Sequence, residues 1–276
     1  MSATIKDKSV LITGAGRGIG KRLAMGFAQA GARVGLLARS QPELDLAKLE
    51  IEQAGGNALR IRADVRDLEQ MAAAVDRMRV VFGGLDVLIA AAGVPGPIGP
   101  LLSTKPAAWN EAVQVNLIGV ANTCRAALPP MVEKRSGKVI LIAGAGASIS
   151  RPNFTAYASS KAAVVRFAEC LADEVRDDNV QVNAMIPGGS YTYMTDEILH
   201  SVAEQSGGSV HWLSDGMPGI RRVERGRRME GEDWVGIAAN NASRVISVEQ
   251  APLLPAWVLL LLLLGTLLWA WRLEGR

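Results

Sequence analysis

Apolar runs of strand length alternate with segments of helical periodicity along the first 190 residues of this chain. The predicted strands cover residues 9–13, 33–38, 59–63, 87–91, 138–143 and 180–186. The predicted helices cover residues 21–30, 43–54, 68–82, 109–128 and 156–175. Strands that alternate with helices indicate β-α-β units, in which a crossover helix joins parallel strands. The pattern therefore favours an α/β fold with a doubly wound parallel sheet.

For some segments the pattern also predicts where the element lies in the fold or where it ends. The run 87–91 contains only apolar residues, which is typical of a central strand covered by helices on both faces. The helix at 109–128 is expected to end at Pro129 and Pro130, because proline lacks the backbone N–H that a helix needs. Towards the C-terminal end the periodicity weakens. Residues 191–203 favour a helix, 206–232 have no clear period, and 244–248 favour one last strand.

A glycine-rich segment, Thr-Gly-Ala-Gly-Arg-Gly-Ile-Gly at residues 13–20, joins the first predicted strand to the first predicted helix. Glycine allows a tight turn and a close approach to a pyrophosphate, and the start of a helix supplies amide donors. Its glycines are Gly14, Gly16, Gly18 and Gly20. Ile19 occupies the third glycine position of the G-x-G-x-x-G fingerprint, so the spacing is G-x-x-x-G-x-G. The place between strand and helix predicts a dinucleotide site, although such a loop alone is a weak signal.

The end of the second predicted strand indicates which dinucleotide is bound. Proteins that bind NAD place an acid there for the ribose 2′-hydroxyl. This chain has Leu-Leu-Ala-Arg-Ser at residues 36–40, with Arg39 in place of an acid, and Arg17 lies in the glycine loop. Guanidinium groups suit a 2′-phosphate, which they bind through paired hydrogen bonds. We therefore predict NADP(H) over NAD(H); the alternative is that both arginines are solvated surface charges.

Tyr157 and Lys161 are four residues apart in a predicted helix and therefore lie on one face of it. A phenol with its ordinary pKa near 10 transfers protons poorly at neutral pH, and a nearby ammonium lowers that pKa. The pair is then a plausible acid–base couple. This spacing is common by itself, and it gains meaning from the glycine loop that precedes it.

Together these segments resemble the short-chain dehydrogenase/reductase family, in the family's order and spacing over roughly residues 5–200. The matching pieces are 13–20, Asp64 with Val65, Ala92 with Gly93, Asn116, Tyr157 with Lys161, and Pro187 and Gly188 with Thr192. The resemblance implies a Rossmann-like domain, a nicotinamide cofactor, and hydride transfer between an alcohol and a carbonyl. It also implies a homo-oligomer, either a dimer or a tetramer, packed through the helices at 109–128 and 156–175.

The resemblance assigns roles to individual residues. Tyr157 would protonate the carbonyl oxygen of a small-molecule substrate. Lys161 would hold the nicotinamide ribose and lower the pKa of Tyr157, and Asn116 would hold a water in a proton relay to Lys161. Asp64 and Val65 would line the adenine pocket. The other implied cofactor contacts are Ile19, Ala91, Gly93, Pro187, Gly188 and Thr192.

Two positions depart from the family's pattern. The serine that hydrogen-bonds the substrate oxygen is replaced by Gly144, and the asparagine after the fourth strand is replaced by Ala91. Losing one hydrogen-bond donor to a substrate oxygen typically costs about 10²–10³ in rate. A backbone N–H or a water near Gly144 could partly replace the serine.

The composition limits the partners of the chain. With 276 residues, 49% hydrophobic and 21% charged, it can bury a core and is not disordered as a whole. A net charge of +3 is too small and too dispersed for a dedicated nucleic-acid binder. The only cysteines, Cys124 and Cys170, exclude a disulfide framework and have no metal spacing with histidine, so no metal is expected. A reducing compartment fits, and no N-terminal signal peptide is visible.

A charge-free, leucine-rich stretch lies near the C-terminal end. Residues 251–271 are 21 residues long, about 31 Å as a helix, which is close to the thickness of a bilayer core. Trp257, Trp269 and Trp271 lie toward its ends, where interfacial aromatic residues occur. We expect a transmembrane helix here. The alternatives are a buried core helix, and a fusion or frame-shift tail without a role.

An arginine cluster precedes this stretch, formed by Arg221, Arg222, Arg225, Arg227 and Arg228. Positive charge on that side of a membrane span predicts a cytoplasmic catalytic domain tethered to the membrane, while a solvated loop is the plainer interpretation. The expected organisation is a nucleotide-binding and catalytic domain at 1–200, a basic irregular lid region at 201–250, the hydrophobic helix at 251–271 and a tail at 272–276.

Three hypotheses about function follow. The first is an NADP(H)-dependent carbonyl reductase or alcohol dehydrogenase with Tyr157 and Lys161 as its acid–base pair, acting on a hydrophobic or lipid-like ketone. The second is an NADP(H)-binding protein of the same fold with weak catalysis, because the serine and the asparagine are missing. The third is a chimera whose last residues do not complete the domain.

Overall fold

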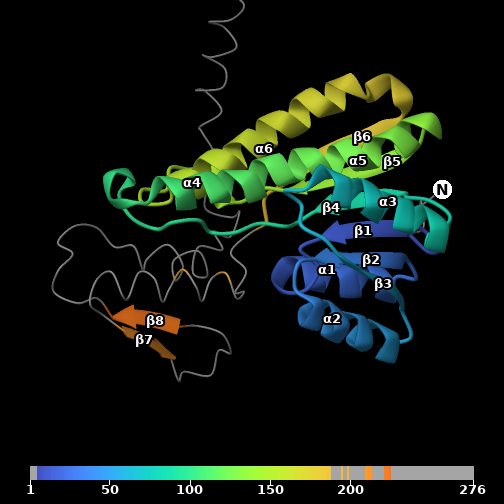
Figure 1. Cartoon of the computed structure of the whole chain (residues 1–276), viewed down its shortest axis with the longest axis horizontal. Coiled ribbons are helices and arrows are strands. Elements are labelled where there is room, and N and C mark those ends of the chain that lie inside the picture. Colours follow the sequence, from blue (N-terminus) through green and yellow to red (C-terminus); the bar gives the residue numbers. More distant parts are fainter. Residues whose placement is uncertain (1–4, 188–193, 195–197, 199–208, 213–220, 225–276) are drawn as a thin grey trace, which may run out of the picture. The chain divides into compact units, whose positions relative to one another are not determined.

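The computed structural model describes residues 5–187, 194, 198, 209–212 and 221–224. Within this part of the chain, six parallel strands form one sheet in the order β3-β2-β1-β4-β5-β6 (Figure 1). The strands are β1 (Ser9–Thr13), β2 (Arg33–Ala38), β3 (Asn57–Arg62), β4 (Val87–Ala90), β5 (Gly137–Ile142) and β6 (Val180–Met185). After β1 the chain adds β2 and β3 on one side of β1. It then crosses over and adds β4, β5 and β6 on the other side. The predicted doubly wound parallel sheet is confirmed.

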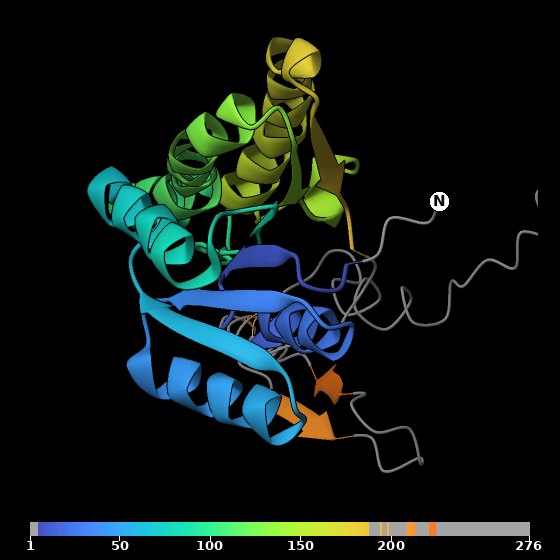
Figure 2. The ribbon, with the colours of Figure 1, turned by 90° about the vertical axis from the view of Figure 1, so that its right-hand side faces the viewer.

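Helices cover both faces of the sheet (Figure 2). They are α1 (Gly18–Gln29), α2 (Gln41–Gln53), α3 (Leu68–Phe82), α4 (Pro106–Val113), α5 (Gly119–Glu133) and α6 (Thr155–Glu174), with short 3₁₀ turns at η1 (Leu101–Ser103), η3 (Ala145–Ala147) and η4 (Arg176–Asp178). Leu11 of β1 joins the core cluster formed with α3, α5 and α6, while Val10 and Ile12 join the cluster formed with α1 and α2. Successive residues of a strand point to opposite faces, so the two clusters lie on the two faces of the sheet.

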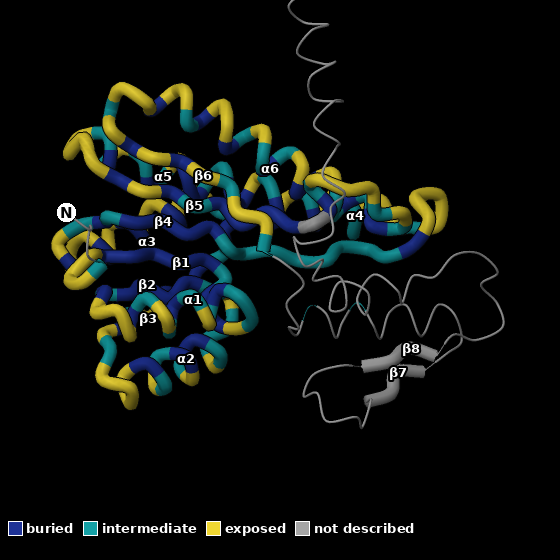
Figure 3. Tube along the Cα trace, turned by 180° about the vertical axis from the view of Figure 1, so that it is seen from behind, coloured by how far each residue is buried: buried dark blue, intermediate teal, exposed yellow. Residues whose placement is uncertain are grey.

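β4 occupies the middle of the sheet, between β1 and β5, and all four of its residues are buried. Leu88 packs into the cluster on one face and Ile89 into the cluster on the other. The dark blue strands in Figure 3 show the same burial across the centre of the sheet. A strand covered on both faces offers no solvated position to a polar side chain. The prediction of a central strand at 87–91 is therefore confirmed.

The single helix predicted at 109–128 is confirmed as one continuous helical segment, but an α-helix throughout would be the wrong description. α4 ends at Val113, a π-helical stretch (η2, Gln114–Ile118) follows, and α5 begins at Gly119. π-helical turns occur as single-turn bulges inside α-helices, and one turn is too short to be recognised from the sequence pattern. The stretch contains Asn116, one of the predicted site residues.

The predicted end of this helix at Pro129 and Pro130 is also wrong, since both residues lie inside α5. Proline there removes helical hydrogen bonds, but its fixed φ is compatible with a helix. Met131 is fully buried, and its Sδ lies 2.6 Å from the point that a Cβ on Gly137 would occupy. This packing holds the last turn of α5 in place beyond the prolines.

Two short strands, β7 (Ser209–Trp212) and β8 (Arg221–Glu224), form an antiparallel pair. They fall in the region 201–250, which the sequence pattern predicts to be irregular, because strands of four residues carry almost no periodicity. In the helix predicted at 191–203, Met194 and Ile198 are helical, and the other residues lie outside the described residues. The predictions at 244–248 and 272–276 also lie outside them.

No helix in the part of the chain that the structure describes combines the length and the apolar character that a membrane crossing needs. The transmembrane helix expected at 251–271 lies outside the described residues, as do Arg225, Arg227 and Arg228 of the arginine cluster. The membrane tether therefore stays a prediction.

The packing of β2 against α3 gives a direct test of this core. Gly35 is buried, and a Cβ there would collide with the Sδ of Met78 and lie 3.1 Å from Cδ1 of Leu11. Overpacking of this kind costs about 1–3 kcal/mol. We expect Gly35→Ala to lower the free energy of unfolding by this amount in a urea titration.

Gly26→Ala is the matched control. Gly26 lies in α1, and apart from its chain neighbours and the backbone of its own helix no atom lies within 4 Å of the Cβ that the substitution adds. Alanine in a helix interior is more stable than glycine by roughly 0.5–1 kcal/mol, so this variant is expected to gain stability. Equal losses in the two variants would contradict the packing described for β2.

Candidate active site

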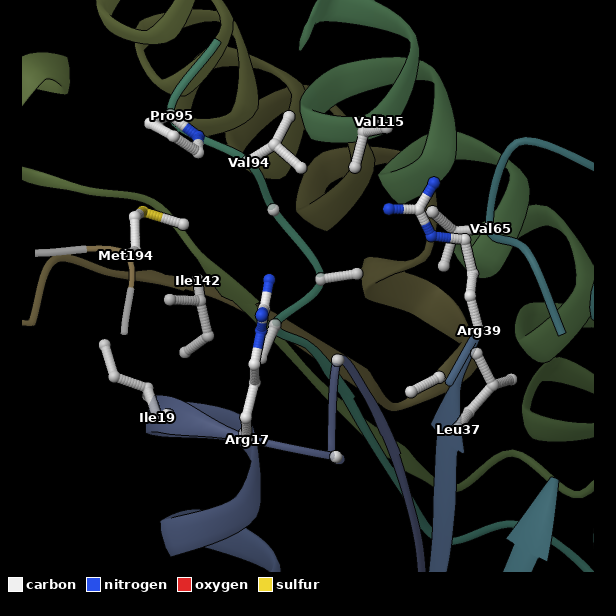
Figure 4. Close-up of a pocket in the computed structure, with 18 of the residues that line it drawn as sticks. Arg17, Ile19, Leu37, Arg39, Val65, Val94, Pro95, Val115, Ile142 and Met194 are labelled. Carbon is white, nitrogen blue, oxygen red and sulfur yellow. The ribbon is translucent and has the colours of Figure 1, made fainter. Parts of the chain in front are cut away.

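A cleft of about 650 Å³ lies at the carboxyl ends of the strands, beside the loop after β1 and the turn after β4 (Figure 4). The strand order reverses between β1 and β4, and α/β sheets bind ligands in the crevice outside such a point. The predicted site residues that line the cleft are Gly14, Gly16, Arg17, Gly18, Ile19, Gly20, Arg39, Asp64, Val65, Ala91, Gly93, Tyr157, Lys161 and Pro187. Asn116 is not among the lining residues, and Gly188 and Thr192 lie outside the described residues.

The glycine loop is pressed against the turn that follows β4. Gly14 has a φ of +69°, and a Cβ on it would lie 2.8 Å from the Cα of Ala92. A Cβ on Gly20 would collide with the carbonyl of Gly14. The Oγ1 of Thr13 accepts hydrogen bonds from the backbone N–H groups of Ala91 and Ala92, each at 3.1 Å. Because only glycine permits both close approaches, backbone rather than side chains forms this wall of the cleft.

α1 begins within the glycine loop and presents its N-terminus to the cleft. Arg17 is the N-cap residue in an extended conformation, and its side chain makes no capping hydrogen bond. Amides in the first turn of a helix have no intrahelical acceptor, and together with the helix dipole they favour an anion. The predicted start at residue 21 is three residues late, because Gly18 and Gly20 have low helix propensity.

Two arginines reach the cleft from different elements. Arg17 extends from the glycine loop and Arg39 from the end of β2, as Figure 4 shows. Each lies near an acid: Nη1 of Arg17 is 3.6 Å from Oε1 of Glu43, and Nη1 of Arg39 is 4.0 Å from Oδ2 of Asp64. The side chains of Arg17 and Arg39 are 49% and 55% exposed, so both pairs are weak ion pairs that a more highly charged ligand can replace.

Arg66 holds Asp64 more firmly than Arg39 does. Its Nε lies 3.1 Å and 3.0 Å from the two carboxylate oxygens of Asp64, and its Nη2 lies 2.6 Å from Oδ2. The hydrogen bonds that Arg66 donates lower the pKa of Asp64 below its usual value, against the opposing effect of burial. The carboxylate of Asp64 therefore remains ionised. It is bound by Arg66, and Asp64 also lines the cleft.

Lys161 is buried behind the cleft, with 3% of its surface exposed. Its Nζ donates a hydrogen bond of 2.8 Å to the carbonyl of Ile142, at the end of β5. The same Nζ lies 5.9 Å from the centre of the Tyr157 ring, since both residues project from one face of α6. Burial disfavours the ammonium and lowers the pKa of Lys161 to about 8.

The expectation that Lys161 lowers the pKa of Tyr157 stays a prediction. Burial raises the pKa of Tyr157 above its ordinary value, and the positive charge of Arg151 opposes this effect. Tyr157 is consequently protonated at neutral pH.

Asn116 lies in the π-helical stretch and is fully buried. Its Oδ1 accepts a hydrogen bond of 2.8 Å from the N–H of Val94, and its Nδ2 donates to the carbonyl of Val94 at 2.9 Å and to Oγ of Ser160 at 3.2 Å. A Cβ on Gly93 would lie 3.2 Å from this Oδ1 and 3.4 Å from Nζ of Lys161. The side chain thus ties the turn after β4 to α6, and the expected relay water stays a prediction.

Gly144 stands where the family's serine is expected, and the hydroxyl of Tyr157 lies directly over it. A Cβ on Gly144 would be 2.5 Å from Oη of Tyr157 and 3.3 Å from its Cζ. The position of the phenol in this structure therefore requires glycine. At this place the site has the hydroxyl of Tyr157 and lacks a side-chain donor from residue 144.

Sequence reasoning missed Glu43, Arg66 and Arg151. Glu43 and Arg66 are charged residues near a helix start or within a loop, which are ordinary positions for surface charges, and Arg151 lies in the connection before α6. Only the folded chain brings Glu43 beside Arg17, because α1 and β2 separate the two residues. Arg66 and Arg151 lie two and six residues from Asp64 and Tyr157, so this closeness in the chain is the signal that could have identified them.

The described residues fit a nicotinamide dinucleotide. Gly14 and Gly20 leave space where a Cβ would collide, and the first turn of α1 offers amides to a pyrophosphate. The cationic side chains of Arg17 and Arg39 line the cleft, and so do Tyr157 and Lys161. The cleft volume of about 650 Å³ suits a cofactor.

Comparison with known proteins gives a consistent result. The short chain dehydrogenase family matches residues 8–203. The 3-oxoacyl-[acyl-carrier-protein] reductase FabG of Staphylococcus aureus is 32% identical over 199 residues, which are 72% of this chain and 80% of that protein.

Solved structures are also similar to this chain. A metagenomic short-chain oxidoreductase in complex with NADP has 32% identity and a TM-score of 0.64, and the match covers 68% of this chain and 85% of that one. NAD⁺-bound xylitol dehydrogenase has 26% identity and a TM-score of 0.71, and the match covers 73% of this chain and 78% of that one.

The matched residues 8–203 contain the six parallel strands and the glycine loop, Tyr157 and Lys161 of the cleft. The resemblance stated from the sequence is confirmed at the level of the family. This chain belongs to the short chain dehydrogenase family of oxidoreductases.

Proposed function

We propose that this protein is an NADP(H)-dependent carbonyl reductase or alcohol dehydrogenase. The observation that carries the proposal is one continuous cleft lined both by the glycine loop and by Tyr157 with Lys161. The similar proteins support it, since they include a 3-oxoacyl-[acyl-carrier-protein] reductase and a short-chain oxidoreductase in complex with NADP.

The cofactor is held by backbone and by charge. The first turn of α1 and the glycine loop bind the pyrophosphate, and Arg17 and Arg39 bind a 2′-phosphate on the adenosine ribose. Asp64 and Val65 line the adenine end. A bound reduced nicotinamide supplies a hydride to the carbonyl carbon of the substrate, and the oxidised form accepts one from the alcohol.

Tyr157 supplies the proton in the direction of reduction. Burial raises its pKa, so the phenol is protonated at neutral pH and donates to the carbonyl oxygen as negative charge develops there. Lys161 is protonated over most of the neutral range, because its pKa is about 8, and it holds the nicotinamide ribose while stabilising the phenolate that forms. The carbonyl of Ile142 fixes the direction of Nζ.

The residues near the catalytic end favour an apolar substrate. Val94, Pro95, Ile142 and Met194 line the cleft there and lie on the same side of the close-up (Figure 4). Apolar walls with few polar groups recognise a ligand chiefly through buried hydrocarbon. We therefore propose a hydrophobic ketone, such as one on an acyl chain, as the substrate class.

Gly144 favours a second candidate, an NADP(H)-binding protein with weak catalysis. No side-chain donor at this position stabilises the developing oxyanion, and one such donor is worth about 10²–10³ in rate. In this second candidate the cofactor binds as above, and turnover is slow because Tyr157 acts alone on the substrate oxygen.

Removing the phenol tests the role of Tyr157. We expect Tyr157→Phe to lower kcat for ketone reduction by about 10²–10⁴, which is the usual contribution of a general acid. The Kd for NADPH should stay within about twofold of the parent, because the ring remains in place. A variant that reduces ketones as fast as the parent would refute the proposed proton donor.

Removing the buried ammonium tests the role of Lys161 through stability. Holding the charged form below pH 8 costs about 3 kcal/mol relative to an ordinary lysine of pKa 10.5. Since the folded protein binds this proton less tightly than the unfolded chain, stability rises as pH increases from about 8 toward 10.5. We expect Lys161→Met to raise the free energy of unfolding at pH 7 by up to about 3 kcal/mol, while kcat falls at least 10²-fold.

The control for Lys161→Met is the same urea titration near pH 10. The gain should largely disappear there, because the lysine is neutral in the folded parent. A variant that is less stable than the parent at pH 7 would contradict the claim that the buried ammonium of Lys161 costs stability.

Gly144→Ser and Gly144→Ala form a matched pair that isolates the missing hydroxyl. Both add a Cβ that displaces the hydroxyl of Tyr157, which lies 2.5 Å from the new atom, so this cost is common to the two variants. Only serine adds a donor for the substrate oxygen. We expect kcat of the serine variant to exceed that of the alanine variant by at least about tenfold, measured by NADPH consumption. A ratio near one would mean that the missing donor does not limit turnover.

A further inference from the structure

Glu43, in the first turn of α2 (Gln41–Gln53), is an acid beside the proposed 2′-phosphate site. It lines the cleft together with Arg17 and Arg39. Arg39 directly follows Ala38, the last residue of β2, and Glu43 lies in the helix that comes next. Both residues line the cleft. The end of β2 has no acid, and α2 thus places one, Glu43, in the cleft instead.

Glu43 is held against the glycine loop. A Cβ on Gly16 would lie 2.9 Å from the Cβ of Glu43 and 3.0 Å from its Oε2, and the other oxygen, Oε1, lies 3.6 Å from Nη1 of Arg17. The absence of a side chain at Gly16 therefore allows the carboxylate to lie beside Arg17.

The two acids of the cleft differ in their partners. Asp64 is held by several hydrogen bonds from Arg66, which leaves it 4.0 Å from Arg39. Glu43 has Arg17 as its single salt-bridge partner among the residues that the structure describes. Within this described part of the chain, the charge of Glu43 is therefore compensated by the same guanidinium that a 2′-phosphate would use.

We propose that Glu43 sets the nucleotide selectivity of this cleft by competing with a 2′-phosphate for Arg17. In the presence of NAD(H), the same carboxylate accepts a hydrogen bond from the ribose 2′-hydroxyl. The protein therefore binds both NADP(H) and NAD(H), with only a modest preference for the phosphorylated nucleotide. This inference rests on the proposed function, because it assumes that a nicotinamide dinucleotide occupies the cleft.

The exposure of the pair makes this competition reversible. The side chains of Arg17 and Glu43 are 49% and 37% exposed, and exposed ion pairs are weak. A phosphate carries more charge than a carboxylate and binds a guanidinium through paired hydrogen bonds, so it displaces Glu43. The displaced carboxylate stays close to the phosphate and repels it, which reduces the affinity for NADP(H).

The test is a fluorescence titration of the full-length protein with NADPH and with NADH. We expect Glu43→Gln to tighten the Kd for NADPH by about five- to tenfold and to weaken the Kd for NADH by about twofold. Glu43→Asp keeps the charge but withdraws it by one methylene, and it should change both constants in the same directions by a smaller factor.

Glu52→Gln is the matched control, because it removes the same charge from the same helix. Glu52 pairs with Lys48 on α2 and does not line the cleft. Both Kd values of this variant should stay within about twofold of the parent. Thermal melts of all variants establish that each is folded.

The outcomes separate the two claims. Tight NADPH binding by the parent with an unchanged NADPH-to-NADH ratio in folded Glu43→Gln would overturn the role of Glu43 and leave the proposed function standing. Failure of the folded parent to bind either nucleotide would overturn the proposed function, and this inference with it. A shift of the ratio in Glu52→Gln as large as in Glu43→Gln would reduce the effect to net charge and also overturn the proposal.

Discussion

The contact between the loop after β1 and the turn after β4 is the constraint on which the rest of the cleft depends. Gly14 approaches Ala92 so closely that any side chain would collide, and Thr13 accepts hydrogen bonds from the backbone of that turn. The turn continues into Gly93, where an added Cβ would lie 3.4 Å from Nζ of Lys161. Through this sequence of contacts, the loop for the nucleotide is fixed relative to the acid–base pair, although they are far apart in the chain.

Burial then sets the chemistry of that pair. It lowers the pKa of Lys161 and raises the pKa of Tyr157, so at neutral pH the site holds a protonated phenol beside a lysine that loses its proton readily. The same burial makes the lysine costly to stability, which is a common property of functional sites. Gly144 belongs to this arrangement, because its missing side chain leaves the space in which the tyrosine hydroxyl lies.

The sequence was sufficient to predict the features that follow from a repeating pattern of apolar residues or from backbone chemistry. The six strands, the central apolar strand and the glycine loop follow from periodicity and from the special freedom of glycine. Features created by tertiary packing could not be predicted. α5 continues through Pro129 and Pro130 because Met131 is buried, and burial raises the pKa of Tyr157. Similarly, only the folded chain brings Glu43 to Arg17.

The proposed reaction of this cleft is the transfer of a hydride from a reduced nicotinamide to a carbonyl carbon. The most direct measurement mixes the full-length protein with NADPH and an apolar ketone, following loss of the reduced nicotinamide absorbance and the amount of alcohol formed. If the cleft catalyses this reaction, loss of NADPH depends on the ketone, and one molecule of alcohol forms for each molecule of NADPH consumed. Bound NADPH that persists across a panel of apolar ketones, with no alcohol formed, would contradict it.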